Sequence, residues 1–229
     1  MKPLVGASGT VHSRDRTALL SNSDMSDHGA RAKPQARLRR PFFMRYTPSV
    51  AKELLGCRLV RILEHERLAG LIVETEAYRG QRDPASHAFR GRTKRNEIMF
   101  GQAGHAYVYF TMGAHFCLNI TTELKETPAA VLIRAIEPVE GVGAMKRNRG
   151  LDDLNGLADG PGKLTKALGI DGDLNGEDII RSTRLFLERG TKPTVILASS
   201  RVGISAGKSF KWRFFVQGSQ FVSKAKPSA

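Results

Sequence analysis

The sequence predicts a mixed α+β fold, a single compact domain built around a curved and largely antiparallel sheet. Apolar and β-branched runs that are typical of strands outnumber the helical segments. These runs lack the regular alternation with helices that a parallel sheet requires. With 229 residues, 41% of them hydrophobic, the chain is long enough to bury one substantial core.

Residues at the ends of two segments indicate helices. Thr47 is a favourable N-cap, Pro48 suits the first helical position, and Gly56 closes the segment. Gly160 opens a later segment, which Gly169 can end in a left-handed conformation. With one further segment between these two, helices are expected over residues 47–55, 139–147 and 161–168.

The strands begin with a predicted β-hairpin. Residues 57–63 and 68–78 are apolar, β-branched runs, and the four polar residues between them suit a turn. The chain contains no internal repeat and no phosphate-binding, glycine-rich fingerprint. Further strands are expected, in chain order, at residues 105–111, 129–137, 194–199 and 212–216.

The first 40 residues are expected to form a disordered, basic N-terminal arm, and residues 41–225 to form the folded domain. The arm is rich in Ser, Gly, Ala, Arg and Asp, has no sustained apolar period, and ends in a basic run that includes Arg37, Arg39 and Arg40. Its Arg and Ser content also suits an organelle transit peptide. Three aspartates argue against that alternative, because such peptides contain few acidic residues.

The charge of the chain favours a polyanionic partner. Lys and Arg number 36 against 22 Asp and Glu, which gives a net charge of +14 and a pI near 10.2. Such a surplus displaces counterions from phosphates and steers a protein toward nucleic acid. Charge alone leaves open the alternative of a merely basic surface.

Two absences in the sequence restrict the class of protein. No run approaches the roughly 20 apolar residues of a membrane-spanning helix, and no secretory signal is recognisable, so a soluble protein located with intracellular DNA is expected. Cys57 and Cys117 lie 60 positions apart without a Cys-x-x-Cys pair or clustered histidines. We therefore expect two reduced core cysteines, no metal site and no iron–sulfur cluster.

Acidic residues gather at the end of the second predicted strand. Alternate side chains of a strand share a face, so Glu74, Glu76 and Tyr78 should project together, away from the intervening residues. The alternative is a solvated strand end with ordinary acids. Arg134 is the one charge in an otherwise apolar run, and a buried arginine needs a carboxylate partner. Glu76 is the obvious candidate.

Basic and aromatic residues follow this acidic strand. His87 precedes a basic, glycine-containing loop at residues 90–96, whose Arg92 and Arg95 could bind phosphates. Tyr107 and Tyr109 should share one face of the next strand, where they could stack on an extruded base or simply fill the core. An acidic site beside a basic loop suits hydrolysis on DNA.

In this combination and order the motifs resemble the alkyladenine DNA glycosylases, also called 3-methyladenine or methylpurine DNA glycosylases. The resemblance covers approximately residues 45–223 and implies a curved antiparallel sheet related in shape to a formyltransferase C-terminal barrel. It further implies a monomeric, monofunctional enzyme of base excision repair that needs no cofactor. Such enzymes flip alkylated or deaminated purines such as 3-methyladenine, hypoxanthine and ethenoadenine out of duplex DNA and hydrolyse the N-glycosidic bond. The segments that carry the resemblance are residues 72–78, His87, and residues 107–109, 116–120, 132–135, 159–164 and 201–203.

The resemblance also implies roles for individual residues. Glu76 matches the general base that activates water, and Arg134 matches the residue that helps to place that water. Lys163, at the start of a helix, matches a contact to the DNA backbone. Val202 and Gly203 match a segment at the pocket rim. The base pocket should contain Tyr78, His87, Tyr109, Asn119 and Leu132.

One departure from the family concerns the residue that fills the gap left by the flipped base. Met112 stands where family members usually carry tyrosine; methionine is apolar and flexible, and such wedges occur among base-unstacking proteins. A DNA-binding module whose pocket has decayed is therefore one alternative. A bifunctional glycosylase that uses a Schiff-base nucleophile is another, but the chain shows no motif for it.

Overall fold

The computed structural model describes residues 35–111, 113–224 and 227–228. The unit Gln35–Ala229 is one compact set of contacts. The arm over residues 1–34 and Met112 lie outside the described residues, so the expectations for both stay predictions. The described part begins earlier than the predicted boundary at residue 41. Leu38 is buried, and its N–H donates to the carbonyl of Leu187 at 2.9 Å, so this end of the expected arm packs on the domain.

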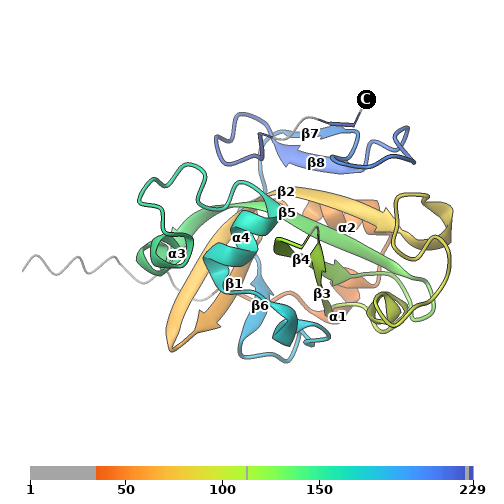
Figure 1. Ribbon diagram of the computed structural model, residues 1–229, viewed down its shortest axis with the longest axis horizontal. Coiled ribbons are helices and arrows are strands. Elements are labelled where there is room, and N and C mark those ends of the chain that lie inside the picture. The colour runs from red at the N-terminus through yellow and green to blue at the C-terminus, as the bar shows by residue number, and fades with distance from the viewer. Residues whose placement is uncertain (1–34, 112, 225–226, 229) are drawn as a thin grey trace, which may run out of the picture. The chain divides into compact units, whose positions relative to one another are not determined.

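Eight strands of the described residues form one curled sheet, and the pairings between them are antiparallel (Figure 1). The main path runs β3-β4-β5-β2-β1-β6, and β8 joins it by pairing with both β2 and β7. This arrangement confirms the predicted fold class. The strands are β1 (Arg58–Leu63), β2 (Glu66–Arg79), β3 (Ala106–Thr111), β4 (His115–Thr121), β5 (Ala129–Glu140), β6 (Leu185–Glu188), β7 (Ile196–Ser199) and β8 (Arg213–Val216).

The long strand β2 organises the sheet. Its first half forms the predicted hairpin with β1, and β5 runs along its other edge (Figure 1). Beyond the end of β1, β8 takes over the free edge and pairs with residues 74–76. The acidic end of β2 is therefore enclosed between two strands. It is an interior position and not the solvated strand end that was the alternative.

The helices come in two pairs, one near the start of the described residues and one after β5. The helices are α1 (Arg40–Phe43), α2 (Thr47–Glu53), α3 (Val142–Arg149) and α4 (Pro161–Leu168), with single 3-10 turns at Gly80–Arg82, Glu97–Phe100 and Gly172–Leu174. The predicted α4 is confirmed, with Gly169 ending it at a φ of 58°. The hydroxyl of Thr75 ties β2 to α2 by donating to the carbonyl of Ala51 at 2.8 Å.

Three local predictions need correction. Thr47 does not cap α2 with its side chain, because its hydroxyl donates to Glu123 at 2.6 Å instead. The segment predicted as helix at residues 139–147 begins as the end of β5, which runs on to Glu140 before α3 starts at Val142. Strands β4 and β6 were not predicted. β6 has only four residues, and the apolar run of β4 is interrupted by Asn119.

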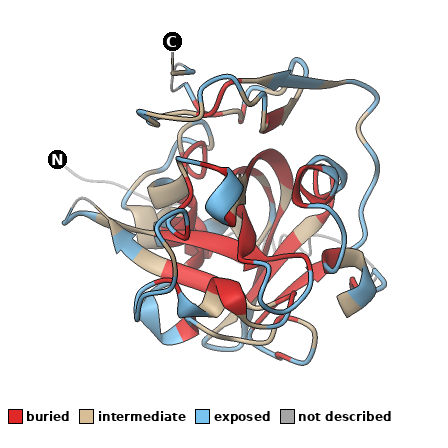
Figure 2. Ribbon diagram, turned by 90° about the vertical axis from the view of Figure 1, so that its right-hand side faces the viewer, coloured by how far each residue is buried: buried red, intermediate tan, exposed pale blue. Residues whose placement is uncertain are grey.

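The main core lies between the sheet and the helices α2 and α4. Buried residues, red in Figure 2, follow the central strands and the helix faces that pack on them. Leu54 of the turn after α2 and Leu164 of α4 join Ile72 and Ile133 in this cluster, all with no exposed surface. A second, smaller cluster surrounds Tyr107. The core thus holds the end of β2 and its neighbours at fixed positions.

Candidate active site

An irregularity in the pairing of β2 with β5 aims an arginine at the acidic end of β2. The register shifts around Glu74, so that Glu74 lies opposite Ala135, Thr75 lies opposite Ile133, and Arg134 is skipped. A bulge of this kind bends the strand and redirects a side chain, and bulges are frequent beside active sites. Arg134 consequently has no directly opposite partner in β2, and its side chain contacts the carboxylates of Glu74 and Glu76 instead.

Glu76 is fully buried, and three donors converge on it. The backbone N–H of Val202 donates to Oε1 at 2.7 Å, and the hydroxyl of Tyr78 donates to Oε2 at 2.8 Å. Nη1 of Arg134 lies 3.4 Å from Oε2. Burial, and next the charge of Glu76, raise the pKa of Tyr78 well above its ordinary value, so this hydroxyl keeps its proton and acts as a donor.

Arg134 pairs with Glu76, as expected, but Glu74 is its closer partner. Nε of Arg134 donates to Oε1 of Glu74 at 2.8 Å, and Nε of Arg213 donates to the same oxygen at 2.7 Å. Ser223 donates twice, from its N–H and its hydroxyl. Burial raises the pKa of Glu74, but Arg134, Arg213 and Ser223 outweigh it and lower the pKa below the ordinary value.

The predicted alternation meets an irregularity at Val73. The pairing of β2 with β5 passes from Ile72 directly to Glu74, so Val73 is left without a paired residue in β5, and it packs against Phe221 and Ala135. A bulge of this kind interrupts the two-residue period of a strand. Glu76 and Tyr78 do share a face, as their hydrogen bond demonstrates.

A second buried ion pair holds the loop that carries Val202. Arg201 and Asp83 are both fully buried, and Nη2 of Arg201 donates to Oδ1 of Asp83 at 2.7 Å. Nη1 of Arg201 also donates to the carbonyl of Ala77 at 2.9 Å, within β2. The guanidinium lies 4.6 Å from the ring centroid of Tyr78. Arg201 therefore fixes the adjacent Val202 amide against Glu76 and supports the ring of Tyr78.

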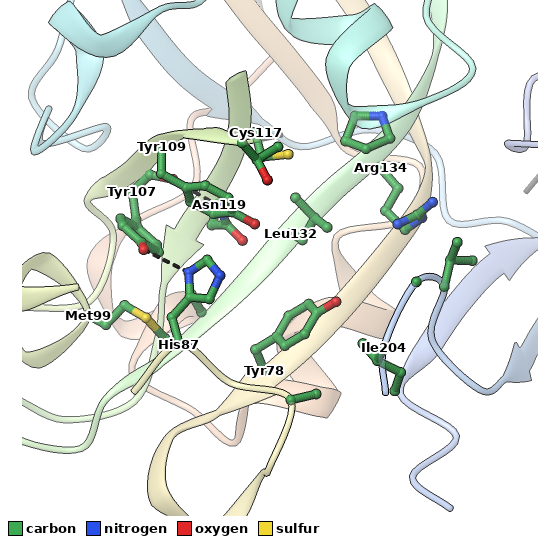
Figure 3. A pocket seen from close by; sticks show the side chains of 16 residues that line it. Tyr78, His87, Met99, Tyr107, Tyr109, Cys117, Asn119, Leu132, Arg134 and Ile204 are labelled. Atoms are coloured by element: carbon green, nitrogen blue, oxygen red, sulfur yellow. Dashed lines mark hydrogen bonds between the residues drawn. The ribbon is translucent and has the colours of Figure 1, made fainter. Parts of the chain in front are cut away.

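An aromatic cavity of about 290 Å³ opens beside these carboxylates. Figure 3 shows His87 and Tyr109 on one side of it, Arg134 and Ile204 on the other, and Tyr78 between them. Its volume falls near the lower end of ligand pockets, which span roughly 300–1,000 Å³, so a small ligand fits best. The cavity is lined by Tyr78, Ala85, His87, Met99, Tyr107, Tyr109, Thr111, Cys117, Asn119, Ala130, Leu132, Arg134, Pro161, Val202, Gly203 and Ile204.

The imidazole of His87 is held in the neutral form. Burial, and next the charge of Arg95, lower the pKa of His87 below its ordinary value. Nδ1 of His87 is hydrogen-bonded to the hydroxyl of Tyr107 at 2.9 Å, and the ring meets Tyr109 edge-on at 4.6 Å between centroids. A neutral imidazole can offer a hydrogen bond to a bound base without repelling a positive one.

The structure brings the predicted pocket residues together. Tyr78, His87, Tyr109, Asn119 and Leu132 line one cavity although they come from five different segments. Arg134 lines it too, whereas Glu76 lies just behind the wall, fully buried and bonded to Tyr78. Val202 and Gly203 also line the cavity, and Val202 reaches the carboxylate itself, which makes its place more central than a rim. Sequence analysis missed the supporting residues Asp83, Arg201, Arg213 and Ser223, all distant in sequence from most of their partners.

The predicted backbone-binding residues are solvent-exposed, and of the three Arg95 contacts a residue that lines the cavity. Arg92 pairs with Glu126, and Arg95 lies 5.1 Å from the ring centroid of Tyr109. Lys163, 46% exposed, donates to Asp159 at 2.7 Å. The exposed pair of Arg92 with Glu126 costs little to exchange for a phosphate, since such a pair contributes only about 0–1 kcal/mol to stability.

The described residues offer neither a cluster of metal ligands nor a membrane-spanning helix. No group of three or more His, Cys, Asp or Glu side chains there is arranged to hold a metal ion. No helix within the described ranges is long and apolar enough to cross a membrane.

A buried carboxylate behind an aromatic cavity, with basic side chains around it, defines a site suited to hydrolysis beside a flat ligand. Comparison with known proteins identifies the family. Residues 41–220 match the model of the methylpurine-DNA glycosylase family. The chain belongs to this family and is a DNA glycosylase.

Individual relatives agree with this assignment. A protein of Carboxydothermus hydrogenoformans, named "Putative 3-methyladenine DNA glycosylase", is 48% identical over 190 residues, which are 82% of this chain and 98% of the relative. A protein of Methanoculleus marisnigri with the same name is 49% identical over 190 residues, covering 80% and 96% of the two chains. A third protein of that name, from Rhodopseudomonas palustris, is 44% identical over 186 residues, covering 81% and 90%.

Proposed function

We propose that this DNA glycosylase excises alkylated and deaminated purines from duplex DNA, with 3-methyladenine, hypoxanthine and ethenoadenine as its types of substrate. The single observation that carries the proposal is the position of Glu76, a buried carboxylate directly behind the wall of an aromatic cavity and held by donors from residues that line it. A base must leave the stack to reach such a cavity, and damaged bases leave at the lowest cost. The protein would act where the DNA is, as a monomer and without a cofactor.

In the proposed reaction, Glu76 takes a proton from water while the water oxygen forms a bond to C1′ of the flipped nucleotide. The bond between C1′ and N9 of the purine breaks, and its electron pair leaves with the base. The sugar passes through an oxocarbenium-like state, whose positive charge the carboxylate stabilises. Arg134, 3.4 Å from Glu76, would help to place the water.

The aromatic walls would select the base. Tyr78 on one side and His87 with Tyr109 on the other can sandwich a purine, and their faces attract a cationic base such as 3-methyladenine. A cationic base leaves as a neutral molecule, whereas hypoxanthine and ethenoadenine need a proton on departure. Asn119, which donates to the carbonyl of Tyr107 at 3.1 Å, is proposed to crowd the exocyclic amine of guanine, with Leu132 shaping the same wall.

A gel assay tests the proposed function. Duplex DNA with one hypoxanthine or one ethenoadenine is incubated with the protein, and strand cleavage is measured with and without alkali. Cleavage only after alkali is expected, because a monofunctional glycosylase leaves the abasic strand intact. Cleavage without alkali would indicate a lyase, and no cleavage of any lesion duplex would contradict the proposal. An undamaged duplex is the control.

A further inference from the structure

Four charged side chains alternate in sign beside the cavity. Glu76, Arg134, Glu74 and Arg213 are linked in that order, with distances of 3.4, 2.8 and 2.7 Å between the contacting atoms. Each side chain is at most 6% exposed. The two carboxylates balance the two guanidinium groups. A buried charge must be compensated in this way, so each member depends on its neighbour.

We infer that Glu74 is a positioning residue for the reaction, acting through Arg134. Glu76 contacts three residues that line the cavity, Tyr78, Val202 and Arg134. Glu74 contacts Arg134, Arg213 and Ser223, and of these only Arg134 lines the cavity. Arg134 lines the cavity and touches both glutamates. Any effect of Glu74 on catalysis therefore passes through this arginine.

The geometry of Arg134 explains what Glu74 contributes. Nε of Arg134 is committed to Glu74 at 2.8 Å, which leaves Nη1 directed at Glu76 at 3.4 Å, longer than a good hydrogen bond of roughly 2.7–3.2 Å. Without the charge of Glu74, Arg134 would close on Glu76 and occupy the carboxylate that water needs. Glu74 thus keeps the guanidinium of Arg134 near Glu76 but prevents a short ion pair between Arg134 and Glu76.

The end of the chain completes this arrangement. Ser223 donates its N–H to Oε2 of Glu74 at 2.7 Å and its hydroxyl to Oε1 at 2.9 Å. Phe221 anchors the same segment against Val73 and Ala135. Ser223 lies beyond residue 220, where the match to the family model ends. The C-terminal segment therefore belongs to the support of the site.

The test compares Glu74→Gln, Arg134→Gln and the double variant in single-turnover excision at saturating enzyme, with lesion-DNA affinity measured alongside. A displaced catalytic arrangement can cost about 100-fold in rate, so Glu74→Gln should slow excision by about 10- to 100-fold while affinity changes by less than about threefold. The double variant should be no slower than Arg134→Gln alone. The inference would be overturned if the effects of the two substitutions on the excision rate add in the double variant. It would also be overturned if Glu74→Gln folds and excises within about twofold of the wild-type rate.

Two further variants separate positioning from folding. Glu123→Gln is the matched control, because Glu123 is also a buried carboxylate bonded to an arginine, Arg79, and to Thr47, but lies outside the cavity wall. It should lower thermal stability and leave the saturated excision rate unchanged. Ser223→Ala removes one donor to Glu74 and should slow excision by about two- to tenfold, the worth of one hydrogen bond, even if Glu74→Gln fails to fold. A normal rate in Ser223→Ala together with an unfolded Glu74→Gln would also overturn the inference.

The inference rests on the proposed function, and the same assay separates the two. If the wild-type protein excises no lesion, the proposed function fails and the role of Glu74 falls with it. If the wild type is active and Glu74→Gln behaves like Glu123→Gln, the proposed function stands and only the role of Glu74 is lost.

Discussion

The buried charges at the end of β2 and the exposed charges of the basic loop differ in how firmly the protein holds them. Glu74 and Arg134 are at most 6% exposed and tied to their partners at 2.7–3.4 Å. Arg92 of the loop is about half exposed and has one carboxylate partner at the surface. Buried ion pairs fix a geometry, whereas exposed ones are screened and exchange easily. The buried charges at the end of β2 should therefore govern the rate of excision, and the exposed basic loop should govern DNA affinity.

The largest effect is expected at the centre of the buried region. Glu76→Gln should reduce single-turnover excision by about 1,000-fold or more, because it removes the proton acceptor and the charge that stabilises the sugar cation. Affinity for lesion DNA should stay nearly intact, since the amide keeps the shape and one acceptor. Excision by this variant within about tenfold of wild type would remove Glu76 from the role of base.

The next largest effect is expected at the second buried ion pair, Arg201 with Asp83. Arg201→Lys should lose the two-point contact to Asp83 and leave a buried charge poorly compensated, which costs about 3–5 kcal/mol of stability. The saturated excision rate should also fall by about 10- to 100-fold, because the amide of Val202 is no longer held against Glu76. Thermal unfolding and single-turnover excision measure the two losses.

Arg40→Lys is the matched control, because the pair of Arg40 with Asp178 is about a quarter exposed and lies away from the cavity wall. It should change stability by no more than about 1 kcal/mol and leave excision unchanged. Arg201→Lys that is destabilised but fully active would show that the pocket does not need this support.

Met112 lies outside the described residues, and its role as the wedge stays a prediction from the sequence. Met112→Ala should weaken the flipped state and Met112→Tyr should strengthen it, because stacking of an aromatic ring on a base is worth about 1–3 kcal/mol. Fluorescence of ethenoadenine in bound duplex reports the unstacking, with excision from single strands as the control. Equal losses on duplex and single-stranded substrates would assign the wedge to another side chain.

A smaller effect, on affinity alone, is expected in the exposed region. Arg92→Gln or Lys163→Gln should weaken binding to damaged and undamaged duplexes alike and reduce the slope of log affinity against log salt by about one. The excision rate at saturating enzyme should remain that of wild type. A changed ratio of damaged to undamaged binding would place the residue in lesion recognition and not in backbone contact.

The smallest effect concerns the N-terminal arm. Deletion of residues 1–34 should leave the saturated excision rate unchanged, because the match to the family begins at residue 41. Nonspecific affinity should fall modestly with the loss of its arginines. A lower rate at saturating enzyme would assign the arm a part in the active site.

Local signals predicted the parts of the fold that local interactions determine. The glycines around α4 and the polar turn after β1 marked their elements correctly, because end residues and turns act within a few positions. The strand β6 was not predicted, because its four residues are stabilised by pairing with β1, which lies more than 100 residues earlier in the chain. Short strands of this kind depend on the sheet and not on their own sequence.

The chemical groups of the site could be predicted from the sequence, but most contacts between its charged side chains could not. The spacing of Glu74 and Glu76 on a strand indicated the paired acids, but nothing in the sequence marks the bulge that lets Arg134 reach both. Ser223 and Arg213 meet Glu74 from about 140 residues away. A contact of that range depends on the finished sheet, so it could not be read from the strand alone.

The proposed separation of excision rate, set by the buried charges of β2, from DNA affinity, set by the exposed basic loop, can be tested in one assay. The single-turnover rate of hypoxanthine excision is measured for wild type, Glu76→Gln and Arg92→Gln over a range of enzyme concentrations and at two salt concentrations. Glu76→Gln is predicted to bind normally yet to yield almost no product at any concentration, and Arg92→Gln is predicted to reach the wild-type rate once enough enzyme and low salt restore binding. A slow saturated rate for Arg92→Gln, or substantial product from Glu76→Gln, would contradict the account.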